Sequence, residues 1–169
     1  MNAMKKILAF ALAGVMALAL LTGCGTGGSA SHKSIAKAMA DHDNGLWNNT
    51  TSITCISSAE LDALLQTWAA DPRFEAVVKA VYTDDALPTI PSGSVPSDKV
   101  VYLYCGKYDK DAGKQAINLN AHSARISGTS ALSLAATRQI GLITTSFTDT
   151  NGEKVKVRFA VVVSEIPTP

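Results

Sequence analysis

The sequence predicts an α+β fold in which N-terminal helices pack on one face of a roughly four-stranded antiparallel sheet. Three observations carry this prediction. Apolar residues recur at helical spacing between residues 34 and 81, they alternate with polar residues in the second half, and Asn151-Gly152 lies between two alternating runs. Helices followed by strands, instead of alternating with them, are typical of α+β domains.

A first, short helix is expected over 34–42, where Ile35, Ala38 and Met39 follow a helical period and Asn44-Gly45 offers a stop. The next segment, 50–56, is rich in Thr, Ser and Ile and predicts an extended stretch.

Two further helices are predicted between residues 57 and 83. The first begins at Ser57, which forms a capping box with Glu60, and the second begins after Asp71-Pro72. Both show one apolar face at the spacing of buried helices. These faces are formed by Leu61, Leu64, Leu65 and Trp68 in the first helix and by Phe74, Val77, Val78 and Val81 in the second.

Residues 83–98 hold three prolines and predict a long surface loop. After the loop, 100–105 is apolar at every position, which indicates a central strand covered on both faces. Ile117 and Leu119 alternate with polar residues, so a half-buried strand is expected over 117–122, after turn chemistry at 108–114.

Asn151-Gly152 predicts a β-hairpin between 139–149 and 153–164. A two-residue loop would place Asp149 opposite Lys154. One face of the second strand is then buried, and it holds Val155, Val157, Phe159, Val161 and Val163. The other face holds Lys154, Lys156 and Arg158 and is expected to lie in solvent. Helices on one face of such a sheet would look cystatin-like or NTF2-like, an analogy at the level of the fold with no motif behind it.

The N-terminus has the three-part pattern of a secretory signal. Lys5 and Lys6 precede an apolar run over 7–21, which is shorter than the ~20 residues of a stable membrane span. The run ends in Leu21-Thr22-Gly23-Cys24, which resembles the lipobox of bacterial lipoproteins. The resemblance covers about 25 residues and implies cleavage before Cys24, a diacylglyceryl group on its thiol, and a location outside the cytoplasm.

This reading divides the chain into a leader over 1–23, a lipidated Gly/Ser-rich tether over 24–31 and one domain over 32–169. Removal of Lys5 and Lys6 leaves 13 Lys+Arg against 14 Asp+Glu. A nearly neutral chain without a basic stripe makes nucleic acid a poor candidate partner.

Two cysteines remain in the domain, Cys55 and Cys105. An even pair in an exported protein favours a disulfide. The alternative is a pair of buried thiols that act as small apolar residues.

No cofactor or metal is expected from the motifs. The Asp109-x-Asp111-x-Gly113 opening of a calcium loop lacks its later ligands, and Asp41-His42-Asp43 does not converge on a helix. The sequence also lacks a recognisable catalytic set, which favours a non-catalytic module that binds an envelope protein, peptide or glycan. Its candidate surface holds Trp47, Asp84, Asp85, Pro88, Pro91 and Pro96. The alternative is a small hydrolase-like envelope enzyme that uses Asp84, Asp85 or the tyrosines at 102, 104 and 108.

Overall fold

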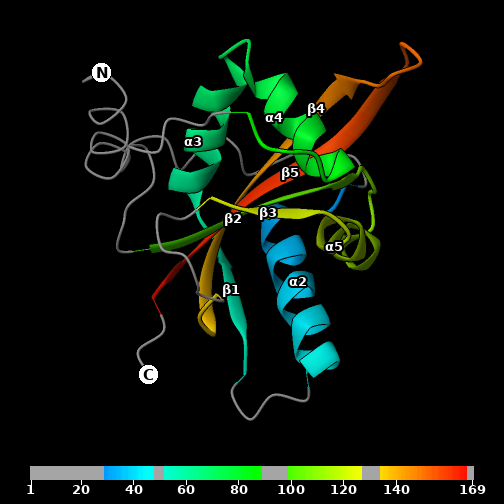
Figure 1. Cartoon of the computed structure of the whole chain (residues 1–169). Coiled ribbons are helices and arrows are strands. Elements are labelled where there is room, and N and C mark those ends of the chain that lie inside the picture. The colour runs from blue at the N-terminus through cyan, green and yellow to red at the C-terminus, as the bar shows by residue number, and fades with distance from the viewer. Residues whose placement is uncertain (1–28, 48–51, 89–98, 127–133, 167–169) are drawn as a thin grey trace.

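The α+β class is confirmed by the computed structural model, which describes residues 29–47, 52–88, 99–126 and 134–166. A five-stranded mixed sheet, in the order β1-β4-β5-β2-β3, forms the centre of the domain (Figure 1). The strands are β1 (Thr54–Ser57), β2 (Lys99–Lys107), β3 (Ser123–Arg125), β4 (Thr137–Thr148) and β5 (Lys154–Glu165). The described helices are α2 (His32–Trp47), α3 (Ala59–Ala69), α4 (Phe74–Thr83) and α5 (Ala112–Asn120).

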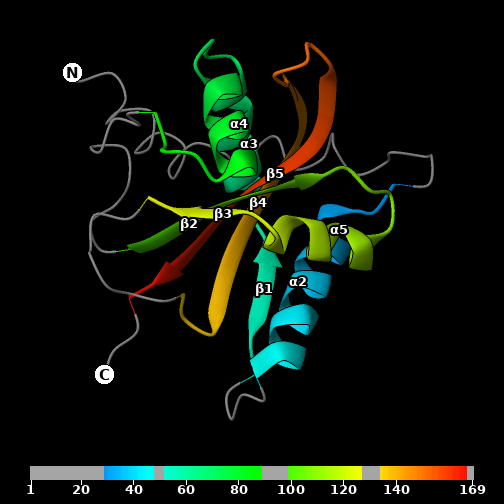
Figure 2. The same ribbon diagram turned by 45° about the vertical axis from the view of Figure 1, so that its right-hand side comes forward.

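The predicted coverage of the sheet on one face is wrong, because helices pack on both faces (Figure 2). Successive strand residues point to opposite faces. On β2, Val101 and Leu103 belong to the cluster that packs against α3 and α4. Tyr104, on the same strand, packs on the opposite face with α2 and α5. The one-face packing of the cystatin-like or NTF2-like analogy is therefore not what this chain adopts.

The sheet also has one strand more than predicted and is not purely antiparallel. The extended stretch predicted over 50–56 forms β1, which pairs in parallel with β4 at the edge of the sheet. Asn44 of α2 supports this edge, since its side-chain amide bonds both the backbone N–H and the C=O of Ile53 (2.8 and 3.0 Å). Helix α2 thus continues through the predicted stop at Asn44-Gly45.

The hairpin of β4 and β5 is confirmed, with a different loop. Thr148 pairs with Lys154, and Asp149 N donates to Glu153 O (2.9 Å), so the loop has three residues and Asp149 lies opposite Glu153. Gly152 adopts a positive φ of 83°, as the last residue of a three-residue loop requires. The predicted Asp149–Lys154 pairing is therefore wrong by one residue.

The predicted faces of β5 are mostly confirmed. Val157, Phe159 and Val161 are buried, with Val155 and Val163 packed beside them. On the other face Lys154 and Lys156 are exposed as expected, but Arg158 is only 3% exposed.

Helices α3 and α4 bury the predicted faces, with Leu65, Val78 and Val81 almost fully covered. The start of α3 differs by one residue. Ser58, not Ser57, is the N-cap, and its hydroxyl accepts the Leu61 N–H (3.3 Å). Where two serines are adjacent, the sequence does not show which of the two hydroxyl groups accepts the N–H of the residue three positions later.

The strand predicted over 117–122 is instead the helix α5. Asp111 caps its N-terminus by accepting the Lys114 N–H (2.9 Å), and Ala116 and Leu119 are buried one turn apart. Ile117 is 58% exposed, so its alternation with Leu119 was coincidental. Short apolar patterns of this kind fit both periods.

Two glycines let helices approach the sheet. A Cβ on Gly106 would lie 2.3 Å from the backbone carbonyl of Asn118 in α5, and one on Gly141 would lie 2.4 Å from the backbone of Leu61 in α3. Each glycine therefore sets the depth at which one helix packs on its face of the sheet.

Candidate functional site

The predicted binding residues fall in different parts of the structure. Asp84, Asp85 and Pro88 follow the end of α4 and are exposed. Trp47 is the last residue of α2, and its side chain lies outside what the structure describes. Pro91, Pro96 and Cys24 also lie outside the described residues. The described part of the predicted surface is therefore the end of α4 and its neighbours.

Asp84 ends α4 in a left-handed conformation, with φ 55° and ψ 29°. Its N–H bonds Val81 O, and the Asp85 N–H bonds Ala80 O (2.9 Å), which is the Schellman arrangement usually completed by glycine. A side chain at this position costs some stability, although Asp tolerates it better than most residues.

The Asp84 carboxylate is 63% exposed and lies 3.0 Å from Nδ1 of His122, the residue before β3. The His122 ring packs against Tyr82 at 5.0 Å between centroids, and Tyr82 in turn contacts the buried Phe147. Next to it, Thr83 Oγ1 donates to the carboxylate of Asp85 (2.6 Å). We call Tyr82, Asp84, Asp85 and His122 the α4-end surface. Two oriented carboxylates lie on this surface, beside aromatic rings that contact the buried core.

A second histidine pair connects the two helical layers across the edge of the sheet. His32 Nδ1 lies 2.8 Å from Asp62 Oδ2, while Asp62 Oδ1 accepts the Leu142 N–H (2.7 Å). The carboxylate is thus shared between the first turn of α2 and the backbone of β4. This double use indicates a structural role in holding α2 and α3 to the sheet.

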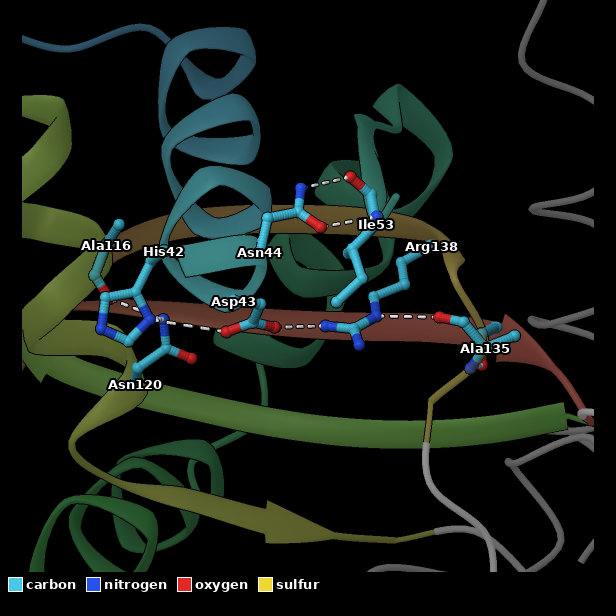
Figure 3. A network of polar contacts seen from close by, with 9 residues as sticks. His42, Asp43, Asn44, Ile53, Ala116, Asn120, Ala135 and Arg138 are labelled. Atoms are coloured by element: carbon cyan, nitrogen blue, oxygen red, sulfur yellow. Dashed lines mark hydrogen bonds and ion pairs between the residues drawn. The ribbon is translucent and has the colours of Figure 1, made fainter. Parts of the chain in front are cut away.

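A polar network links the end of α2 to β4 and α5 (Figure 3). Asp43 Oδ2 accepts Nη1 of Arg138 at 2.5 Å, and the two side chains are only 18% and 14% exposed. Arg138 Nε also donates to Ala135 O (2.9 Å). His42 lies beside Asp43, and its Nδ1 is 3.3 Å from the side-chain nitrogen of Asn120. Removing one member of an ion pair that is largely shielded from solvent destabilises the fold. The network therefore holds α2 on the sheet.

The predicted Cys55–Cys105 disulfide is wrong, since both thiols are free. Cys55 lies on the edge strand β1 and packs with the α2–α5 face, whereas Cys105 lies on β2 within the opposite cluster. Three strand spacings separate them, about 14 Å, and a disulfide needs Cα atoms within ~7 Å. The alternative of two covered thiols is the one the structure supports.

Burial also determines the reactivity of the two thiols. It raises the pKa of Cys55 to about 11, with Arg138 opposing the shift and Asp43 adding to it. It raises the pKa of Cys105 to about 12. Both groups are therefore protonated at neutral pH and are weak nucleophiles.

Thiol titration checks this directly. The native domain should react with a disulfide reagent at pH 8 far more slowly than a model thiol, and unfolding should release both Cys55 and Cys105 without a reductant. Protected thiols in the unfolded, unreduced protein would contradict the structure.

Burial likewise raises the pKa of Tyr104 to about 12, which makes this tyrosine a poor acid–base group at neutral pH. Among the residues that the structure describes, no group of three His, Cys, Asp or Glu side chains is placed to hold a metal ion. None of the described helices is both long and apolar enough to span a membrane.

No protein-family model, curated protein or solved structure matches this chain. Asp84 and Asp85 were predicted from the sequence. His122, the partner of Asp84, and the Asp43–Arg138 ion pair were not. Pairs such as Asp84 and His122, separated by 38 residues, depend on how β3 returns beside α4, and no local pattern encodes that return.

Proposed function

We propose that the chain is an exported lipoprotein, anchored through lipid on Cys24, whose domain binds a partner at the cell envelope without catalysing a reaction. The anchor is supported by the basic and apolar leader followed by Leu21-Thr22-Gly23-Cys24. The binding role is supported above all by Asp84, which keeps an exposed carboxylate in a conformation that glycine adopts more easily.

The contacts of the α4-end surface support recognition of a polar or cationic group. Asp84 and Asp85 present carboxylate oxygens from consecutive residues, oriented by His122 and Thr83. Tyr82 and His122 add aromatic area beside them. Oriented acceptors beside a flat aromatic surface suit a basic peptide, a protein loop or the hydroxyl groups of a glycan.

Asp84→Gly separates a binding role from a structural one. Glycine relieves the left-handed strain, and the exposed Asp84–His122 pair is worth little, so the free energy of unfolding should change by less than about 1 kcal/mol. Binding to the envelope partner should nevertheless fall. The measurement is photocrosslinking in intact cells with a photoreactive residue at position 85, with and without Asp84→Gly.

A photoreactive residue at Gln66, exposed on α3, is the matched control and should give no discrete adduct. Adducts that do not depend on position, or on Asp84, would contradict the α4-end surface as the binding site.

A small envelope hydrolase is the second candidate, favoured by the two aspartate–histidine pairs in which Nδ1 faces the carboxylate. Turnover of a peptidoglycan, ester or phosphate substrate that is abolished by His122→Ala or His32→Ala would favour this enzyme and refute the binding module.

A further inference from the structure

The start of the domain is fixed to the end of the sheet that carries the β4–β5 loop. Ala30 N donates to Lys110 O (2.9 Å), and Ser29 Oγ contacts both Tyr108 Oη (3.1 Å) and an Nη2 of Arg158 (3.2 Å). Figure 2 shows these first residues, in blue, beside the connection from β2 to α5. Ser29 and Ala30, near the end of the predicted tether over 24–31, therefore contact the folded domain.

This attachment limits the distance between the domain and an anchor on Cys24. Five residue steps separate Cys24 from Ser29, and at up to ~3.6 Å per step they span about 18 Å at most. The surface around Ser29 would then lie within reach of the headgroups of the bilayer that holds the lipid.

The same surface is cationic. Lys154 and Lys156 are exposed in the first residues of β5, and Lys110 is exposed beside Ala30. Lys156 Nζ lies 4.0 Å and Arg158 Cζ 5.2 Å from the centre of the Tyr108 ring. We call these five residues the tether-base face; they are Tyr108, Lys110, Lys154, Lys156 and Arg158.

Arg158 is the unusual member of this face. Its side chain is 3% exposed, its Nε has no hydrogen-bond partner, and no carboxylate contacts it within the described part of the chain. Desolvation lowers its pKa, opposed by the nearby Tyr108. A covered guanidinium without a counter-charge is costly, and an anion close to this end of the domain would offset that cost.

Charge is divided unevenly along the mature chain. Residues 107–114 and 149–158 hold six Lys+Arg and four Asp+Glu, whereas the rest of the chain from Cys24 holds seven and ten. Three of those four acidic residues are held in turns by backbone N–H groups. Asp109, Asp111 and Asp149 accept from Asp111, Lys114 and Asn151, respectively. These two segments therefore carry a small excess of positive charge, next to Glu75, whose carboxylate accepts the Thr148 N–H (2.8 Å).

We propose that the tether-base face docks on the anionic phospholipid headgroups of the bilayer in which the Cys24 lipid is inserted. This inference rests on the proposed lipid anchor. The short tether holds the face close to the surface at high effective concentration, so a few cations suffice to orient the domain. Docking in this orientation directs the opposite end of the domain away from the bilayer.

Lysine labelling on vesicles tests the proposal. The purified mature protein is reconstituted into vesicles of phosphatidylcholine alone or with one third phosphatidylglycerol, and the rate of amine labelling is measured at each lysine. Labelling of Lys110, Lys154 and Lys156 should slow about fivefold on the anionic vesicles, the effect of roughly one cation's attraction to the surface. High salt should restore the rate.

A charge-matched pair of variants shows whether the effect is local. Lys154→Glu with Lys156→Glu should abolish the protection of Lys110, whereas Lys37→Glu with Lys79→Glu, on α2 and α4, should leave it intact. Equal labelling on the two kinds of vesicle, or loss of protection in both variants, would overturn docking by this face. A purified protein that does not float with either vesicle lacks the anchor, and that result would overturn the proposed function first.

Discussion

Replacement of Phe159 by alanine should lower the free energy of unfolding by about 3–5 kcal/mol, the range for deleting a fully buried aromatic ring. Phe159 lies at the centre of β5 with no exposed surface, and its ring meets Phe74 of α4 edge-on at 5.3 Å between centroids. The substitution removes both the buried area and this aromatic contact, and the rigid sheet cannot close the cavity.

Chemical denaturation monitored by circular dichroism measures this loss. Lys154→Ala, on the exposed face of the same strand, is the control and should change the free energy of unfolding by no more than about 0.5 kcal/mol. Similar losses at the two positions would show that the faces of β5 are assigned incorrectly.

Gly106→Ala should also destabilise the domain strongly, by about 3 kcal/mol, the upper end for an overpacked core. The added Cβ would lie 2.3 Å from the carbonyl of Asn118 and 2.6 Å from the Leu119 nitrogen. Backbone atoms cannot rotate away as a side chain does, so α5 must shift from β2 and lose the packing of Leu119.

Gly45→Ala is the matched control, because it adds the same methyl group where nothing lies within 4 Å. Gly45 occupies an exposed position in α2, where alanine favours the helix by about 0.5–1 kcal/mol. Urea midpoints should therefore move in opposite directions for the two variants. A wild-type midpoint for Gly106→Ala would mean that α5 does not cross β2 at this glycine.

The parts of the fold that the sequence predicted are those with long, unambiguous periods. The apolar faces of α3 and α4 repeat over two to three turns, and polar and apolar residues alternate from Lys154 to Phe159 on one strand. A register error of one residue in the hairpin loop did not change the buried face, because alternation is set within the strand.

The errors arose where a local pattern was short or where the outcome depended on distant residues. The strand-like spacing of Ile117 and Leu119 was not enough to distinguish α5 from a strand, and the Asp111 cap favours the helix instead. Whether helices cover one face of the sheet or both depends on the path of α2 and α5 around it. The burial of Arg158 and of the two cysteines has the same origin, because the helices on each face of the sheet determine which strand residues are covered.

The candidate site follows the same division. Asp84 and Asp85 were found from the composition of their loop, which is local. Their orientation required the left-handed end of α4 and the approach of His122 from β3, which are features of the tertiary structure. The partly buried Asp43–Arg138 pair, which joins residues 95 positions apart, had no signal in the sequence.

Mass spectrometry of the mature protein from the membrane fraction tests whether Cys24 carries the lipid anchor. The N-terminal peptide should begin at Cys24 and carry a diacylglyceryl group, and Cys24→Ala should accumulate as an uncut precursor without fatty-acid label. A mature N-terminus at another residue, or an unmodified Cys24 in a protein that still fractionates with the membrane, would contradict the lipid anchor on Cys24.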